Sequence, residues 1–152
     1  MQKQKLYLAH NLENREDVRK WQLRVESKYN IIFINPFYQS YRKEITDLDV
    51  MKSKKEKFEY KQKMTKSACK NIVKQDLNMI RKSDGILAIL SSPTIGTAQE
   101  IFFASYVLRI PVYVITAKYY TIHPWLRTLC KEIFISKKQF TNYLTGLVGR
   151  RD

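Results

Sequence analysis

Glu100 is an acidic residue in an unusual setting. It closes the stretch SSPTIGTAQE (residues 91–100), which separates the apolar runs GILAIL (85–90) and IFFA (101–104). One interpretation is local: Thr97 and Glu100 have the spacing of a capping box, in which each side chain bonds a backbone N–H of the first helical turn. The other is chemical: a carboxylate that follows a buried strand lies at the mouth of an α/β sheet, where it could act as a nucleophile.

Asp76 is a second acidic residue in a costly position. At 100° per residue it falls about 40° from Ile80, beside an apolar stripe on the same helix. The predicted stripe consists of Cys69, Val73, Leu77 and Ile80. A carboxylate there must be paired with a cation or backbone N–H, or be functional. Two carboxylates that share a pocket can cleave a glycosidic bond, one as nucleophile and the other by protonating the leaving group.

Apolar strands alternate with helical segments along the chain. Strands are expected at residues 5–9, 31–35, 85–90, 111–116 and 132–136. Helices are expected at residues 15–29, 58–81, 96–108 and 138–147, and residues 37–57 are predicted to be a loop or lid. Continuous apolar strands of this kind are typical of a parallel sheet covered on both faces. We therefore expect one α/β domain over residues 1–152, Rossmann-like or flavodoxin-like, with about five parallel strands and helices on both faces.

In such sheets ligands bind beyond the carboxyl ends of the strands. This rule selects three loops, at residues 10–14, 35–41 and 91–100. In the third loop, Gly96 permits a close backbone approach or a positive φ angle. The helix that follows offers N–H groups and the positive end of its dipole to an anion.

Composition excludes several classes of protein. The chain has 152 residues and is 44% apolar, enough for one domain with a real core. It has no apolar run long enough for a membrane span and no signal-peptide pattern at its start. Two distant cysteines and two histidines match no metal or redox spacing, so we expect neither metal nor cofactor, and a reducing cytoplasm fits.

The net charge of +14 attracts anions such as nucleic acid, membrane surfaces or phosphorylated small molecules. Much of it lies in residues 52–66 (KSKKEKFEYKQKMTK). Such a run is typical of a solvated helix face. No repeated aromatic–basic pattern accompanies it, which makes a nucleic-acid binder the less favoured interpretation.

The segment QDLNMIRKSDGILAILSSPTIGTAQEIFFA (residues 75–104) resembles the nucleoside 2-deoxyribosyltransferase superfamily, which includes deoxynucleoside 5′-monophosphate N-glycosidases. The strand opening LYLA (6–9) also fits, and the resemblance spans residues 7–116. The Asp-Leu-Asn helix, the Ser-Asp turn and the Gly-x-x-x-Glu turn follow the family's order and spacing. Each is weak alone, and together they are fairly specific.

The resemblance implies roles for individual residues. Glu100 matches the nucleophile that attacks C1′ of the deoxyribose, and Asp76 matches the acid that handles the leaving base. Tyr7 matches an aromatic residue that lines the sugar site and orients the nucleophile. Thr94 matches the residue that faces the 5′ end of the substrate, where the family has Asp for a hydroxyl and a small hydroxyl residue for a phosphate. Ser91, Ser92 and the helix start at Gly96 favour a phosphate as well.

Three residues depart from the family pattern or match it less securely. His10 stands where the family has glycine, and it could crowd the pocket or contact a phosphate. Arg15 resembles an arginine near the phosphate, although this loop aligns only with a gap. His123 lies in a region from which, in the family, a neighbouring subunit completes the site; an ordinary loop histidine is the alternative.

Together these features predict hydrolysis of the N-glycosidic bond of a 2′-deoxynucleoside 5′-monophosphate, by a homodimer or larger oligomer that needs no metal or cofactor. Its partner is then a small-molecule deoxynucleotide or deoxynucleoside, not a membrane. Two alternatives stay open. One is a deoxyribosyltransferase that exchanges bases between nucleosides. The other is a nucleotide-binding module without turnover, which the replacement of glycine by His10 favours.

Overall fold

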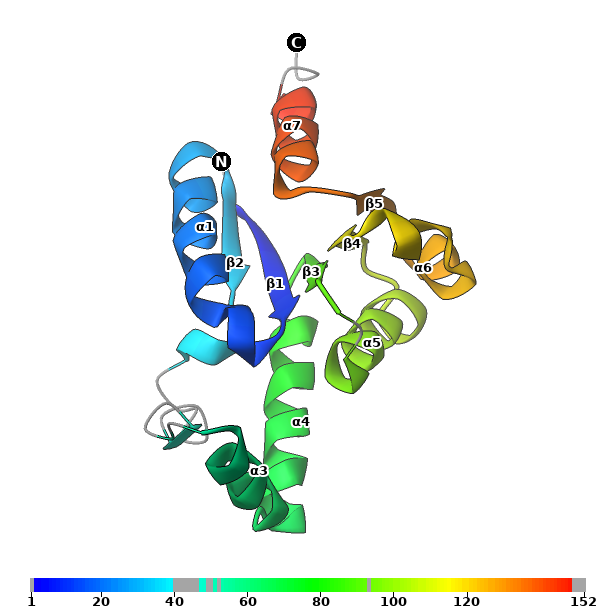
Figure 1. The fold of residues 1–152 in the computed structure, drawn as a ribbon. Coiled ribbons are helices and arrows are strands. Elements are labelled where there is room, and N and C mark those ends of the chain that lie inside the picture. The colour runs from blue at the N-terminus through cyan, green and yellow to red at the C-terminus, as the bar shows by residue number, and fades with distance from the viewer. Residues whose placement is uncertain (1, 40–46, 49–50, 52, 93, 149–152) are drawn as a thin grey trace.

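A five-stranded parallel sheet forms the centre of the protein (Figure 1). The computed structural model describes residues 2–39, 47–48, 51, 53–92 and 94–148. The strands are β1 (Gln4–His10), β2 (Ile31–Ile34), β3 (Gly85–Leu90), β4 (Val112–Thr116) and β5 (Glu132–Phe134). They lie in the order β2-β1-β3-β4-β5, and every neighbouring pair is parallel. The predicted α/β architecture is confirmed, and the strand positions agree with prediction to within two residues.

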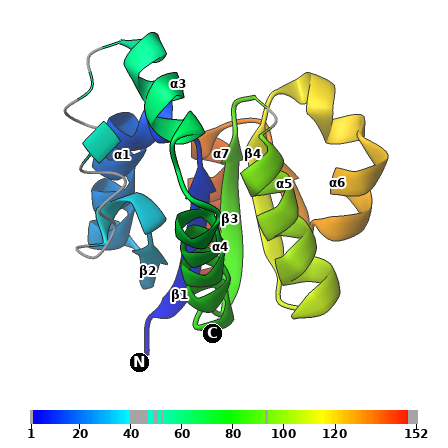
Figure 2. The same cartoon turned by 90° about the horizontal axis from the view of Figure 1, so that it is seen from below.

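Helices cover both faces of the sheet, and Figure 2 shows α4 and α7 on opposite sides. Side chains alternate along β1, so Leu6 and Leu8 pack in one layer while Tyr7 and Ala9 pack in the other. The first layer contains α1 (Arg15–Lys28) and α7 (Lys137–Val148). The second contains α4 (Lys66–Arg81), α5 (Ile95–Phe102) and α6 (Pro124–Leu129).

The single helix predicted for residues 58–81 is wrong, because the structure has two helices there. The first, α3 (Lys54–Gln62), begins at Ser53 with a capping box that Glu56 completes. The second begins after Thr65, whose hydroxyl accepts the Ala68 N–H at 3.1 Å. A Ser or Thr cap satisfies the free N–H groups of a new helix, which favours a break at this point. The loop predicted for residues 37–57 is thus helical from 54 onward, and residues 40–46, 49–50 and 52 lie outside the described ones.

The apolar stripe predicted for α4 is wrong in its first half. Cys69 is exposed and Val73 is 56% exposed. The N-terminal half of α4 extends beyond the sheet beside α3 (Figure 1), so it has no sheet to pack against. The face that does pack carries Met79 and Ile80, both buried. Asp76 lies one turn before Ile80 and is half-buried, which places its carboxylate on this inward face.

The helix predicted for residues 96–108 has the expected place but a different form. After α5 the chain continues as a π-helical segment, η3 (Phe103–Val107). Two residues after it, Arg109 has a φ of 56°, which lies in the left-handed region. The remaining short elements are 3-10 turns: η1 (Leu12–Asn14), η2 (Pro36–Tyr38) and η4 (Lys118–Ile122). In the described part of the chain, no helix has the length and apolar character needed to cross a membrane.

Candidate active site

The strand order creates a switch point between β1 and β3. From β1 the chain crosses to β2 on one side, and β3 lies on the other side of β1. The loops after β1 and β3 therefore diverge at the carboxyl edge, which is where α/β sheets bind ligands. Most of the predicted site residues lie on β1 or between the end of β3 and the end of α5: Tyr7, His10, Ser91, Ser92, Thr94, Gly96 and Glu100.

A hydrogen bond joins two predicted catalytic residues that are 93 positions apart. The Tyr7 hydroxyl donates to Oε1 of Glu100 at 2.7 Å. Tyr7 is fully buried in the layer that contains α4 and α5, whereas Glu100 is half-buried on α5. A buried phenol holds its partner in one rotamer, because breaking the bond would leave the hydroxyl unpaired. The Glu100 carboxylate is thereby fixed over the centre of the sheet, as expected for a nucleophile that a tyrosine orients.

The start of α5 differs from the predicted capping box. Thr94, not Thr97, is the N-cap: its hydroxyl accepts the Thr97 N–H at 3.3 Å and donates to the Thr97 hydroxyl at 2.9 Å. Thr97 is buried in the first turn, which removes it from the cap position. The capping-box interpretation is therefore wrong for both residues: Thr97 is not the N-cap, and the Glu100 carboxylate accepts from Tyr7. The Thr94 side chain is half-buried at the entrance to the helix.

Two asparagines connect the loops after β1 and β3. The Asn14 amide donates to Oγ of Ser91 at 2.9 Å, and the Asn11 amide donates to Oγ of Ser92 at 3.2 Å. Both serines are exposed. No local sequence pattern singles out these asparagines, because their serine partners lie 77 and 81 residues away. The two bonds close the edge of the switch point around the predicted phosphate loop.

Asp76 reaches the same layer from another helix. It is half-buried on the face of α4 that packs against the sheet, and α4 also packs against α5. Both predicted carboxylates thus come from helices of one layer, and Glu100 is the one that the Tyr7 hydroxyl contacts. Burial of such a group requires pairing or function, as the sequence indicated.

His10 does not crowd the open edge of the sheet. Its side chain is 5% exposed and hydrogen-bonds to Asn35 and to the Asn11 carbonyl. The ring also meets Phe37 edge-on. Arg15 begins α1, and its guanidinium donates to the Leu12 carbonyl at 3.4 Å.

Gly96 is the second residue of α5 and has a negative φ, so the positive-φ interpretation is wrong. A Cβ built there would meet nothing within 4 Å. The open space in front of this residue is what a close ligand approach would need.

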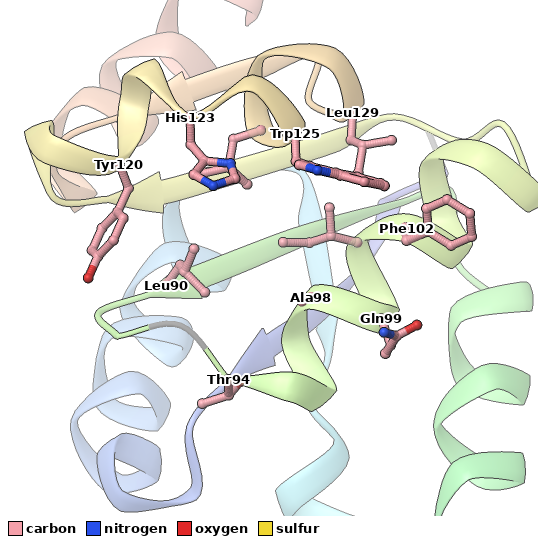
Figure 3. Close-up of a pocket in the computed structure, with 11 residues that line it drawn as sticks. Leu90, Thr94, Ala98, Gln99, Phe102, Tyr120, His123, Trp125 and Leu129 are labelled. Carbon is pink, nitrogen blue, oxygen red and sulfur yellow. The ribbon is translucent and has the colours of Figure 1, made fainter.

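A cavity of about 540 Å³ lies on the other side of α5, towards α6 (Figure 3). Thr94 and His123 both line it, so the structure brings these two predicted residues together. Tyr7, Asp76 and Glu100 are not among its lining residues. The cavity walls are largely apolar and include Leu90, Ile101, Phe102, Tyr120, Trp125 and Leu126. The segment around η4 has no periodic pattern that would place it against α5. The wall residues Tyr120, Trp125 and Leu126 were therefore not predicted from the sequence.

Exposed aromatic residues continue outward from this cavity. Phe102 stacks on Tyr106 with ring centroids 5.2 Å apart, and it also contacts Trp125 at 6.3 Å. Tyr106 is 70% exposed and Trp125 is 62% exposed. We refer to Phe102, Tyr106 and Trp125 as the aromatic face. Two of its three rings, Tyr106 and Trp125, are therefore apolar groups left in contact with solvent.

The thiols and the acidic groups offer no other obvious chemistry. Burial raises the pKa of Cys130 to about 12, which makes this thiol a poor nucleophile. Cys69 is exposed on α4, away from the switch point. Among the residues that the structure describes, no three His, Cys, Asp or Glu side chains gather as metal ligands would. What the described residues do offer is one carboxylate held by a hydrogen bond, that of Glu100, and a second one, that of Asp76, on another helix of the same layer.

Comparison with known proteins gives matches at the level of structure. No protein-family model matches the chain, and no curated protein sequence does either. Its structure superposes on a 2-deoxyribosyltransferase from the psychrotolerant bacterium Bacillus psychrosaccharolyticus with a TM-score of 0.60, at 20% identity over 91% of each chain. It also superposes on the Clostridium botulinum CMP N-glycosidase BcmB with a TM-score of 0.54, at 17% identity over 93% of this chain and 98% of the other. The protein thus has the fold of the group that its motifs resemble.

Proposed function

We propose that the protein cleaves the N-glycosidic bond of a 2′-deoxynucleoside 5′-monophosphate. The observation that carries this proposal is the bond between Tyr7 and Glu100, which holds a carboxylate against the central strand β1. The fold supports it, since one structural neighbour is named a glycosidase and the other a deoxyribosyltransferase.

In the first step an oxygen of Glu100 attacks C1′ as the C1′–N bond breaks. The bonding electron pair leaves with the base, and Asp76 supplies the proton that neutralises it. The product is a deoxyribosyl ester of Glu100. Water then attacks C1′ and gives its proton to the Asp76 carboxylate, which releases deoxyribose 5-phosphate and restores both side chains. Tyr7 holds Glu100 in line throughout.

The preference for a 5′-phosphate rests on the other end of the site. Thr94 presents a neutral side chain where an acidic one would repel a phosphate. Ser91, Ser92 and the first turn of α5 at Gly96 provide hydroxyl and backbone donors. The net charge of +14 favours capture of an anion, although salt screens this effect. Arg15 is a further cation for this end.

Base exchange is the second candidate function. It differs only in the last step, where a second base replaces water as the acceptor at C1′. The observation that favours it is the superposition on a 2-deoxyribosyltransferase over most of both chains. Incubation with a deoxynucleotide and a second free base distinguishes the two, because only exchange forms a new nucleotide.

We also propose that the protein forms a homodimer or larger homo-oligomer through its aromatic face. The face is too exposed to stabilise a monomer, and aromatic residues are enriched at the centres of protein interfaces. It borders the cavity that Thr94 and His123 line, so a second subunit docked here would border the 5′ end of the site.

The roles of the two carboxylates predict different losses. Glu100→Ala should reduce base release from deoxynucleotides by more than about a thousandfold, because it removes the nucleophile.

Asp76→Asn keeps the size of the side chain but cannot deliver a proton, so it should slow the release of poor leaving groups more than that of good ones. Release of free base by chromatography measures both. More than about a tenth of wild-type activity in Glu100→Ala, or equal slowing of all bases by Asp76→Asn, would reject the assigned role.

Thr94→Asp tests the phosphate preference without breaking the helix cap, since Asp is as good an N-cap as Thr. Two charge-assisted hydrogen bonds to phosphate give the wild type a preference of about a hundredfold or more over the free nucleoside. The substitution should abolish this preference. The measurement is kcat/KM for each deoxynucleotide and for its nucleoside. CMP is included because one structural neighbour is named a CMP N-glycosidase. Thr94→Ser is the matched control and should keep the preference. A wild type that favours nucleosides would point to base exchange instead.

The oligomer is tested by sedimentation velocity. Wild type should sediment as a dimer or larger species, and Tyr106→Lys should shift it towards the monomer because it buries a charge in the interface. Leu23→Lys is the control, because Leu23 is 49% exposed on α1 in the opposite layer. A wild-type monomer, or equal effects of the two substitutions, would contradict an interface at the aromatic face.

A further inference from the structure

A chain of polar side chains is buried behind the carboxyl end of β1, in the layer opposite Glu100. His10, Gln22 and Asn35 are 5%, 1% and 1% exposed. Nε2 of His10 lies 3.1 Å from Oδ1 of Asn35, and the Asn35 amide donates to Oε1 of Gln22 at 3.0 Å. The Gln22 amide donates in turn to the Glu26 carboxylate at 2.9 Å. This series of hydrogen-bonded side chains thus runs from Glu26 on α1 to His10, the last residue of β1.

The direction of these hydrogen bonds is fixed at both ends. Glu26 accepts from the Phe33 N–H at 2.7 Å as well as from Gln22, so the Gln22 amide must point its NH₂ towards it. Asn35 accepts the Phe37 N–H at 3.1 Å on Oδ1. Its oxygen therefore faces His10, and its NH₂ faces Gln22.

Both ring nitrogens of His10 consequently face acceptors. Nε2 meets Oδ1 of Asn35, and Nδ1 meets the carbonyl oxygen of Asn11 at 3.0 Å. A neutral imidazole has only one N–H, so it can satisfy one of these contacts. The doubly protonated ring satisfies both. The geometry around His10 is that of a site for the imidazolium ion.

The electrostatic surroundings oppose this charge in the empty protein. Burial lowers the pKa of His10, and the positive charge of Lys137, from α7, lowers it further. The hydrogen bonds to Asn11 and Asn35 raise it but do not compensate. The groups that face the ring from η2 and the β1 loop are neutral, and the Glu26 charge lies beyond Asn35 and Gln22. At neutral pH the ring is therefore uncharged, and one of its two contacts is unmet.

The residue that His10 contacts leads directly to the ligand edge. The Asn11 carbonyl faces the ring, while the Asn11 side chain holds Ser92. An anion bound at Ser91 and Ser92 would lie on the far side of this one residue. A negative charge close to the ring favours its protonated form.

We propose that His10 is a proton-linked positioning residue: when a 5′-phosphate binds at the Ser91–Ser92 loop, the buried imidazole takes up one proton from solvent and clamps the loops that carry Asn11 and Asn35. The proton forms an N–H bond on whichever ring nitrogen lacked one, and no other bond changes. His10 acts through Asn11 and does not touch the substrate. This inference rests on the proposed phosphate site, and it gives a role to the histidine that replaces the glycine of the resembled family.

Nuclear magnetic resonance titration tests the proposal directly. The chain has two histidines, and His10→Gln identifies the His10 signal by its loss. The Glu100→Ala background prevents turnover. We expect a 5′-deoxynucleotide to raise the pKa of His10 by about one unit or more, equivalent to about tenfold in affinity. Inorganic phosphate at saturation should act in the same direction, and the matching deoxynucleoside should not.

The pH dependence of binding provides a second measurement. As pH rises through the pKa of His10, the wild-type Kd should rise relative to that of His10→Gln, by up to about tenfold for a pKa shift of one unit, since proton uptake becomes harder. The phosphate's own ionisation cancels in this comparison. Calorimetry in buffers of different ionisation enthalpy should show proton uptake by wild type only.

The outcomes separate this inference from the proposed function. A His10 pKa that no phosphate ligand shifts overturns it, whether or not the protein releases base. A shift of the same size with the deoxynucleoside also overturns it, because the sugar and base would then be the cause. A phosphate-dependent shift without base release in wild type supports the role of His10 while rejecting the glycosidase. If His10→Gln fails to fold, His123→Gln leaves a single histidine signal that belongs to His10, and the titration of that signal decides.

Discussion

The hydrogen bond between Tyr7 and Glu100 is the constraint on which the site depends. Tyr7 is fully buried beneath the helical layer, so its hydroxyl must find a partner inside the protein, and Glu100 is that partner at 2.7 Å. Together with the buried side chains of Thr97 and Ile101, this contact turns one face of α5 towards the sheet. It also requires the helix to begin early enough for residue 100 to lie inward. The cap at Thr94 provides that start, and the same residue then stands at the 5′ end of the proposed site.

The two faces of the sheet carry different polar groups. The layer with α4 and α5 holds the carboxylates, whereas the layer with α1 holds the buried polar chain that ends at His10. Asn11 lies between them, since its carbonyl faces His10 and its amide holds Ser92. The two faces meet only at the carboxyl edge, where parallel strands leave their ends open. The apolar cavity beyond α5 is not lined by Tyr7, Asp76 or Glu100, and it shares Phe102 and Trp125 with the aromatic face.

The sequence predicted the sheet well, because buried parallel strands are continuous apolar runs that stand out from their surroundings. It predicted α4 poorly. Cys69 and Val73 follow the helical period, but the part of α4 that carries them extends past the sheet and stays exposed. The interpretation of Thr97 as a cap failed because Thr94 competes for the same role three residues earlier. Contacts between distant segments, such as Asn14 with Ser91, leave no local pattern that a single sequence could reveal.

The central claim is that Glu100 becomes covalently bonded to the sugar. A nucleotide that carries fluorine at the 2′-carbon of its sugar can form such an ester with the protein. The hydrolysis of this ester is slow, because fluorine destabilises the positive charge that develops at C1′ in the transition state. Intact-protein mass spectrometry after incubation should show one added fluorosugar phosphate per chain, and peptide mapping should place it on Glu100. Release of the base with no adduct on the protein, or an adduct on any other residue, would contradict the account.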